Sequence, residues 1–186
     1  MDPHRALPVL CALIGAAACA TGPSAKASAP TEYDVKAAYL YNFAQFVQWP
    51  GRMPINGNFS ICVLGMDPFG RSLDKAVAGQ TVDRRRVIAK RIETAKDTAG
   101  CRILFISSSE AGSLKDVLAE LGEESILTVS DIPQFVERGG MIDFVLQDNR
   151  VRFEVNLAAA KRAGLTLSSQ LLKVAARVEP AAPARS

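Results

Sequence analysis

Apolar and polar residues are arranged along the chain in two alternating patterns. Short runs of mostly apolar residues are typical of buried strands, and four occur: Phe59–Leu64, Cys101–Ile106, Ile126–Val129 and Met141–Leu146. Between these runs, apolar residues recur three and four positions apart, which indicates helices that each bury one face. This alternation predicts an α/β three-layer sandwich, in which helices cover both faces of a mostly parallel central sheet of about six strands.

Periodicity and capping residues place the helices of the first two thirds of the chain. The first helix begins at Glu32, and its apolar face is expected to consist of Val35, Ala38, Tyr39, Asn42, Phe43, Phe46 and Val47. Asp67-Pro68 is expected to open a second helix that runs to about Val77. A third helix is expected over Leu114–Leu121, and a short one from Pro133.

The last third of the chain is expected to add a C-terminal β-hairpin and two helices. Asp148-Asn149 forms the turn between the fourth apolar run and the alternating segment Val151–Val155, which is the returning arm of the hairpin. Asn156 then opens one helix. The final helix is expected over Leu167–Val178.

The N-terminal segment has the features of a secretory signal peptide. Arg5 precedes a short apolar run that ends in small residues, and this run is shorter than the roughly 20 residues that span a bilayer. Cleavage is expected before Thr21 or after Ala27. Acylation of Cys19, as in a lipoprotein, is an alternative.

We therefore expect a secreted protein that folds as one domain. Its parts are a signal peptide and linker (residues 1–29), an α/β domain (30–178) and a flexible tail (179–186). The net charge of +3 over 186 residues is close to neutral, so no nucleic-acid partner is expected. The basic residues at 84–91 fall in the strand candidate Val82–Ile92 and are interpreted as the solvated side of an edge strand.

Loss of the signal peptide would limit the chemistry available to the mature protein. It would remove His4, which is the only histidine, together with Cys11 and Cys19. Without a histidine, Ser-His-Asp and Cys-His catalytic arrangements are excluded, and the sequence has neither a phosphate-binding P-loop nor metal-ligand spacing. We therefore expect a binding or regulatory module that is not an enzyme and that uses no metal or cofactor.

Two cysteines would remain, Cys62 and Cys101, each on a predicted buried strand. In an oxidising compartment they favour one disulfide, which would close a loop of about 40 residues and stabilise the fold by about 3–4 kcal/mol. Two buried free thiols are the alternative.

Polar residues follow the buried strands at their carboxyl ends, where α/β sheets commonly bind ligands. Asp67, Ser107 and Ser108 are the candidate residues of a ligand-binding crevice there, with Asp131 beside them. Such a crevice would make the protein a small-ligand-binding sensor module. Alternatively, Asp67, Ser109 and Asp131 only cap helices.

Long blocks of this sequence resemble the YfiR family over nearly all of residues 32–178. The matching blocks are Tyr33–Phe43, Phe46–Pro50, Ile61–Gly70, Cys101–Glu110, Leu127–Asp131, Gly139–Ile142, Arg152–Leu157, Ala163–Leu165 and Ser168–Leu172. The resemblance implies a periplasmic negative regulator that binds the periplasmic part of an inner-membrane diguanylate cyclase and holds it inactive. It would thereby control cyclic-di-GMP signalling and biofilm formation.

The resemblance also implies partners and site residues. Family members form homodimers, and an outer-membrane lipoprotein can sequester them. The pair Cys62/Cys101 matches the family's core disulfide, whereas Val136 and Asp143 stand in the region where some members carry a second cysteine pair. We expect the partner to contact the hairpin and the following helix, through Ile142, Glu154 and Ala160. The alternative for each of these three residues is ordinary packing.

Overall fold

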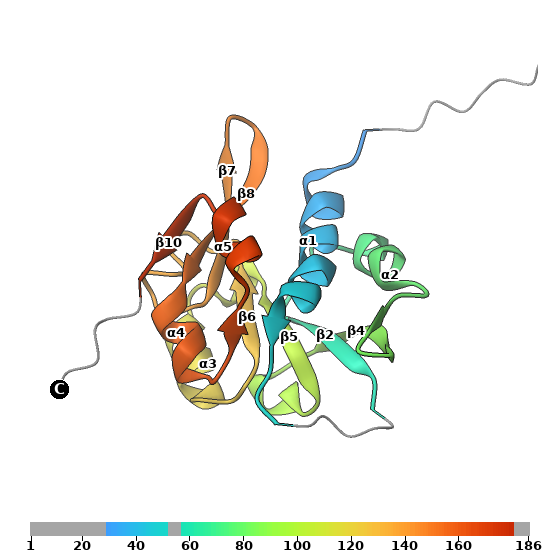
Figure 1. Ribbon diagram of the computed structural model, residues 1–186, viewed down its shortest axis with the longest axis horizontal. Coiled ribbons are helices and arrows are strands. Elements are labelled where there is room, and N and C mark those ends of the chain that lie inside the picture. Colours follow the sequence, from blue (N-terminus) through green and yellow to red (C-terminus); the bar gives the residue numbers. More distant parts are fainter. Residues whose placement is uncertain (1–28, 52–56, 181–186) are drawn as a thin grey trace, which may run out of the picture.

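The computed structural model describes residues 29–51 and 57–180, so the expected signal peptide lies outside the described residues apart from position 29. Eight strands form one sheet in the order β10-β8-β7-β6-β5-β2-β4-β3 (Figure 1). The strands are β2 Phe59–Leu64, β3 Thr81–Val82, β4 Arg85–Ile92, β5 Cys101–Ile106, β6 Leu127–Ser130, β7 Ile142–Gln147, β8 Arg150–Asn156 and β10 Arg177–Glu179. Neighbouring strands are parallel except in the hairpins β3–β4 and β7–β8. The expected mostly parallel sheet with a C-terminal hairpin is confirmed, and the short edge strands β3 and β10 widen it.

Helices cover both faces of this sheet, which confirms the three layers. They are α1 Glu32–Phe46, α2 Arg71–Val77, α3 Leu114–Leu121, α4 Leu157–Arg162 and α5 Ser169–Val174, with short 3₁₀ turns η1 Ala95–Thr98 and η2 Ser108–Glu110. One core lies between the sheet and α1, α2, α4 and α5, and the other lies between the sheet and α3. A separate two-stranded ladder joins β1 (Val47–Gln48) to β9 (Thr166–Leu167).

Helix α1 buries only part of the face that the sequence predicts, namely Phe43 and Val47, with Tyr39 and Phe46 packed beside them. Ala38 and Asn42 are exposed, whereas the buried residues are Lys36, Ala37, Leu40, Phe43 and Ala44. The aromatic contacts explain the orientation, because the Phe43 ring lies 5.1 Å from Phe153 and 5.8 Å from Phe144. A lysine on the buried side makes the true apolar stripe hard to see from periodicity alone.

Two predicted elements are interrupted by residues with left-handed backbone. Asp83 and Arg84 have φ values of 48° and 64° and form a two-residue turn, so the predicted strand over Val82–Ile92 is in fact the hairpin β3–β4. The helix predicted from Pro133 is a series of turns that includes Gln134 at φ 62°.

Two predicted helices are shorter than expected. Asp67 does not cap a helix: its Oδ1 accepts a hydrogen bond from the Phe69 N–H at 2.8 Å, and α2 begins only after Gly70. The predicted final helix over Leu167–Val178 is reduced to α5. The chain after α5 is extended and pairs in parallel with β8 as strand β10, because that edge of the sheet offers free backbone groups.

Candidate partner-binding site

The predicted disulfide is present between Cys62 on β2 and Cys101 on β5, with the two Cα atoms 5.9 Å apart. Both residues are buried in the core under α3. A β-bulge makes this possible: Ser60 pairs with Cys101 but Ile61 pairs with Ile103, so β5 carries one extra residue. Because side chains alternate between the faces of a strand, the extra residue places Cys101 on the same face as Cys62.

A buried ion pair joins the start of α1 to the end of β6. The Lys36 Nζ lies 2.6 Å from Asp131 Oδ2 and 2.5 Å from Glu32 Oε1, and the Tyr33 hydroxyl donates to the same Asp131 oxygen at 3.0 Å. The Lys36 side chain is only 4% exposed. Burial alone would lower the pKa of Lys36, but the hydrogen bonds to Asp131 and Glu32 outweigh it and raise that pKa. Lys36 therefore stays charged and holds α1 against the sheet.

Three ionisable residues form a row across the last three strands. Asp143 on β7 is the register partner of Glu154 on β8, and Glu154 is the register partner of Arg177 on β10. The Arg177 Nε and Nη2 donate to Glu154 Oε2 at 2.9 and 2.6 Å, and Nη2 also contacts Glu137. The bond to Arg177 lowers the pKa of Glu137, and the bonds to Glu137 and Glu154 raise the pKa of Arg177. This network ties β10 to the hairpin.

Asp143 is the buried end of this row. It is 3% exposed, and its Oδ2 accepts a hydrogen bond from the Phe135 N–H at 3.0 Å. Burial raises the pKa of Asp143 to about 7, and the negative charges of Glu154, Glu137 and Asp131 add to the effect. The Phe135 hydrogen bond acts in the opposite direction but is too weak to reverse the shift. The loop before β7, which contains Phe135, is therefore held by a carboxyl group whose pKa lies near neutral pH.

The β7–β8 hairpin projects beyond the layers of helices (Figure 1). Along β7, Ile142, Phe144 and Leu146 share one face because side chains alternate. Their exposure is 0%, 4% and 58% respectively, so this apolar row leaves the core and reaches solvent at Leu146. Leu146 is therefore an apolar side chain exposed to solvent on the hairpin.

The residues predicted to contact a partner lie at different depths. Glu154 is half-buried and paired with Arg177. Ile142 and Ala160 are fully buried, which favours the alternative of ordinary packing over a partner contact: Ile142 packs in the central sheet, and Ala160 packs from α4 into the same core. Leu146 and Arg177 were missed. Alternation along the predicted strand could have found Leu146, whereas the position of Arg177 depends on the unexpected pairing of β10.

The residues of the predicted ligand crevice do lie together, beyond the carboxyl ends of β2 and β5. Ser107 is buried and its Oγ donates to the Met66 carbonyl at 2.6 Å. Asp67 accepts hydrogen bonds from Phe69 N–H and from Arg91 Nε, and Ser108 is exposed. The polar groups of Ser107 and Asp67 are thus used to hold their own loops. Ligand binding at this crevice stays a prediction.

Residues 29–51 and 57–180 contain neither a cluster of metal ligands nor a helix that could span a membrane. No group of three or more His, Cys, Asp or Glu side chains there is placed to hold a metal ion. Within the same ranges, no helix combines the length and the apolar character needed to cross a bilayer.

Two solved structures are similar to this chain to different degrees. A conserved domain protein from Vibrio cholerae O1 biovar El Tor is similar with a TM-score of 0.52 and 10% sequence identity, over 80% of this chain and 60% of that chain. The ABC domain in complex with L-Trp from Streptococcus pneumonia has a TM-score of 0.49 and 12% identity, over 65% of this chain and 55% of that one. This chain therefore spans 60% or less of either protein. The Vibrio similarity shows a shared fold alone.

The family is shown by a direct sequence match. The family model described as YfiR/HmsC-like matches residues 33–176, which include all the strands of the main sheet up to β8 and all five α-helices except the first residue of α1. The match also contains both disulfide cysteines and the ionisable residues Lys36, Asp131, Asp143 and Glu154. The chain therefore belongs to the YfiR/HmsC-like family, which is a family of regulatory domains.

Proposed function

We propose that this protein is a periplasmic negative regulator that binds the periplasmic part of an inner-membrane diguanylate cyclase and holds it inactive. Membership of the YfiR/HmsC-like family over residues 33–176 is the observation that supports this proposal. Regulation of this kind needs no catalysis, because a protein that binds the inactive state of its partner more tightly shifts the partner toward that state. The result is less cyclic-di-GMP and less biofilm. In the same proposal the protein is a homodimer, and an outer-membrane lipoprotein releases the cyclase by sequestering it.

The projecting hairpin is the contact that we propose for the cyclase. Interfaces combine an apolar centre with a polar rim. Leu146 supplies the exposed apolar group, and the Glu154–Arg177 ion pair lies on the same hairpin and its neighbouring strand. A shift from 1% to 99% inactive cyclase needs about 5.5 kcal/mol of differential binding, more than the roughly 1.5–3 kcal/mol that burying one leucine contributes. The complete interface therefore extends beyond Leu146.

The proposal is tested by measuring cyclic-di-GMP in cells that express the protein together with a membrane diguanylate cyclase that has a periplasmic portion. The wild-type protein is expected to lower cyclic-di-GMP, and the hairpin variant Leu146→Asp is expected to restore it by placing a charge in the apolar contact. Met66→Asp is the matched control, because Met66 is also an exposed apolar residue, at 77%, but follows β2 instead of lying on the hairpin.

Each outcome has a distinct meaning. Repression by Met66→Asp but not by Leu146→Asp, with both variants folded by circular dichroism, supports the regulator and its hairpin contact. Equal repression by both variants places the contact elsewhere on the protein. Absence of repression by the wild-type protein, for every such cyclase of the source organism, overturns the proposed function.

A further inference from the structure

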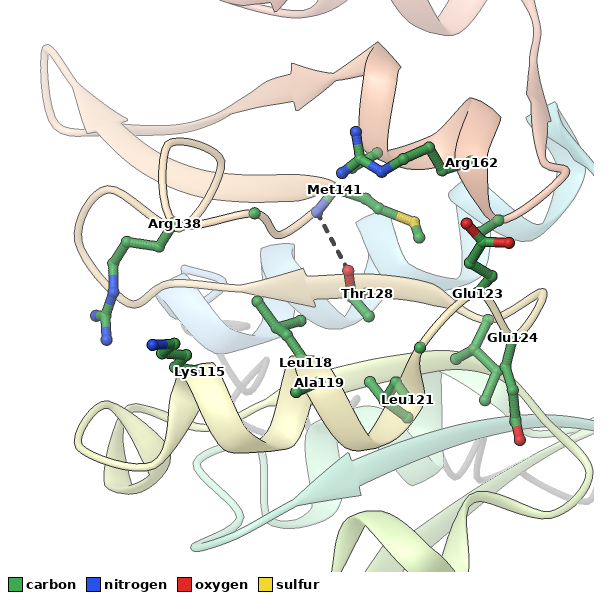
Figure 2. Close-up of a pocket in the computed structure, with 15 residues that line it drawn as sticks. Lys115, Leu118, Ala119, Leu121, Glu123, Glu124, Thr128, Arg138, Met141 and Arg162 are labelled. Atoms are coloured by element: carbon green, nitrogen blue, oxygen red, sulfur yellow. Dashed lines mark hydrogen bonds between the residues drawn. The ribbon is translucent and has the colours of Figure 1, made fainter.

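A pocket of about 290 Å³ is lined by residues of α3, α4, β6 and the segment before β7 (Figure 2). It forms because β6 and β7 pair only through Val129–Ile142 and Ser130–Asp143, so the chain before β7 is free to arch away from the sheet. Thr128 lies beneath this arch, and its hydroxyl oxygen accepts a hydrogen bond from the Met141 N–H at 3.1 Å. That bond fixes the arch and keeps the space beside it open.

Part of the pocket wall is apolar and part is polar. Aliphatic side chains from α3, α4 and the two connecting segments line it: Leu118, Leu121, Ile126, Met141, Ala159 and Ala163. Thr128 is the buried polar residue among them, at 3% exposed, and its hydroxyl hydrogen has no acceptor among the described residues. A hydrocarbon group fits this lining, and a single polar atom of a ligand could use the free hydroxyl hydrogen.

The two ends of the pocket differ in charge. Figure 2 shows Arg138 and Lys115 together at one end, and Arg162 with Glu123 near the other. The Arg138 Nη2 donates to the Ala111 carbonyl at 2.7 Å, which positions the guanidinium while its other N–H groups stay available. Neither Arg138 nor Lys115 is within ion-pair distance of a carboxylate in the described part of the chain. This end therefore attracts an anion, and arginine is suited to binding a carboxylate through two parallel hydrogen bonds.

We propose that this pocket is a binding site for a small organic carboxylate with a compact hydrocarbon body. The carboxylate would lie between Arg138 and Lys115, and the hydrocarbon would cover Leu118 and Met141. The volume is at the small end of the range for ligand sites, which limits the body to about one ring or a short chain. The site is separate from the crevice at Ser107, and its existence does not depend on the cyclase function.

The test uses 3-phenylpropionate as the probe and isothermal titration calorimetry as the measurement. The neutral analogue 3-phenylpropan-1-ol has the same hydrocarbon body and is expected to bind at least about tenfold more weakly, because it lacks the charge. The double variant Lys115→Gln/Arg138→Gln is expected to weaken binding of the acid about tenfold or more. Lys90→Gln/Lys161→Gln is the matched control, since it removes the same number of cations outside the pocket.

Backbone amide shifts measured by NMR locate the bound probe without any substitution. Saturable shifts centred on Thr128, Met141 and Leu118 support the site. The proposal is overturned if the acid shows no saturable binding at millimolar concentration, or if both double variants bind it equally. Shifts confined to residues outside the pocket overturn it as well. None of these readouts involves cyclase activity, so the result is independent of the proposed regulator function.

Discussion

Asp143 and Glu154 face each other across the β7–β8 hairpin as register partners, yet Glu154 alone has a cationic partner in the described part of the chain. Glu154 is bonded to Arg177 at 2.6 Å, whereas Asp143 is buried and, among residues 29–51 and 57–180, is hydrogen-bonded by the Phe135 N–H alone. Two carboxylates placed side by side repel each other when both are ionised. The charge of Glu154 is therefore stabilised by its ion pair with Arg177, whereas a charge on Asp143 is unfavourable in the folded protein.

The first prediction concerns pH. The pKa of Asp143 rises from 3.8 to about 7 in the folded protein, so the folded state binds this proton more tightly than the unfolded chain does. The resulting contribution to stability is complete below about pH 4 and is lost as pH rises to about 7. Since one pKa unit corresponds to about 1.4 kcal/mol, the loss is on the order of 4 kcal/mol.

Asp143→Asn is expected to remove this loss, because the amide oxygen can still accept the Phe135 N–H while no charge forms. Urea unfolding at pH 5 and pH 8 should therefore show a smaller difference for the variant than for the wild type. Asp148→Asn, an exposed position at φ 48° that asparagine tolerates, should behave like the wild type. The pKa of Asp34 is lowered to about 2 by its hydrogen bonds to Ser72 and Thr31. Protonation of Asp34 therefore changes stability only below about pH 4, outside the range between pH 5 and pH 8. Identical pH profiles for wild type and Asp143→Asn would contradict the prediction.

The second prediction concerns the disulfide. Cys62→Ser is expected to lower the free energy of unfolding by about 3–4 kcal/mol, since the bridge joins residues 39 apart in sequence and restricts the unfolded chain. Thermal unfolding with and without a reductant provides the matched comparison. The wild-type midpoint should fall when the bridge is reduced, and the variant's midpoint should not change. Under the proposed function, the variant should also repress the cyclase less. Equal wild-type midpoints in both conditions would argue against the bridge.

The third prediction concerns the buried ion pair. Lys36→Met is expected to cost about 3–5 kcal/mol, because it leaves the Asp131 carboxylate largely buried with only the Tyr33 hydroxyl as a partner. Adding Asp131→Asn to that variant should recover part of the loss, since the stranded charge is then gone. Urea unfolding of the two single variants and the double variant gives the coupling energy. Strictly additive effects would mean that the pair contributes no interaction of its own.

The fourth prediction concerns Gly140, which lies directly against the Phe135 ring. A Cβ atom at position 140 would overlap that buried ring, so Gly140→Ala is expected to destabilise the protein by about 1–3 kcal/mol. Gly112→Ala is the matched control, because a Cβ atom there meets nothing within 4 Å and the backbone has no positive φ. Thermal unfolding of both variants tests the difference. A Gly140→Ala protein as stable as Gly112→Ala would show that Phe135 moves aside freely.

Several elements could be predicted from the sequence because their signals are local. β2 and β5 have the predicted bounds, since a run of apolar residues ends where polar residues begin. The turn at Asp148-Asn149 and the cap at Asn156 depend on residue types that favour those backbone conformations, and both are in place. The crevice residues Asp67 and Ser107 were also placed at the correct end of the sheet, although both side chains hold their own loops.

The chain by itself thus indicated the three layers and the main strands, and it favoured a disulfide between Cys62 and Cys101, because these depend on local patterns of apolar residues and on residue chemistry. Only the tertiary structure decided which side of α1 is buried, since Lys36 can enter the core only where Asp131 meets it. The same holds for β10, which is a strand because β8 offers it an edge, and for the bulge that turns Cys101 toward Cys62. These features depend on partners distant in sequence, and no local pattern encodes such partners.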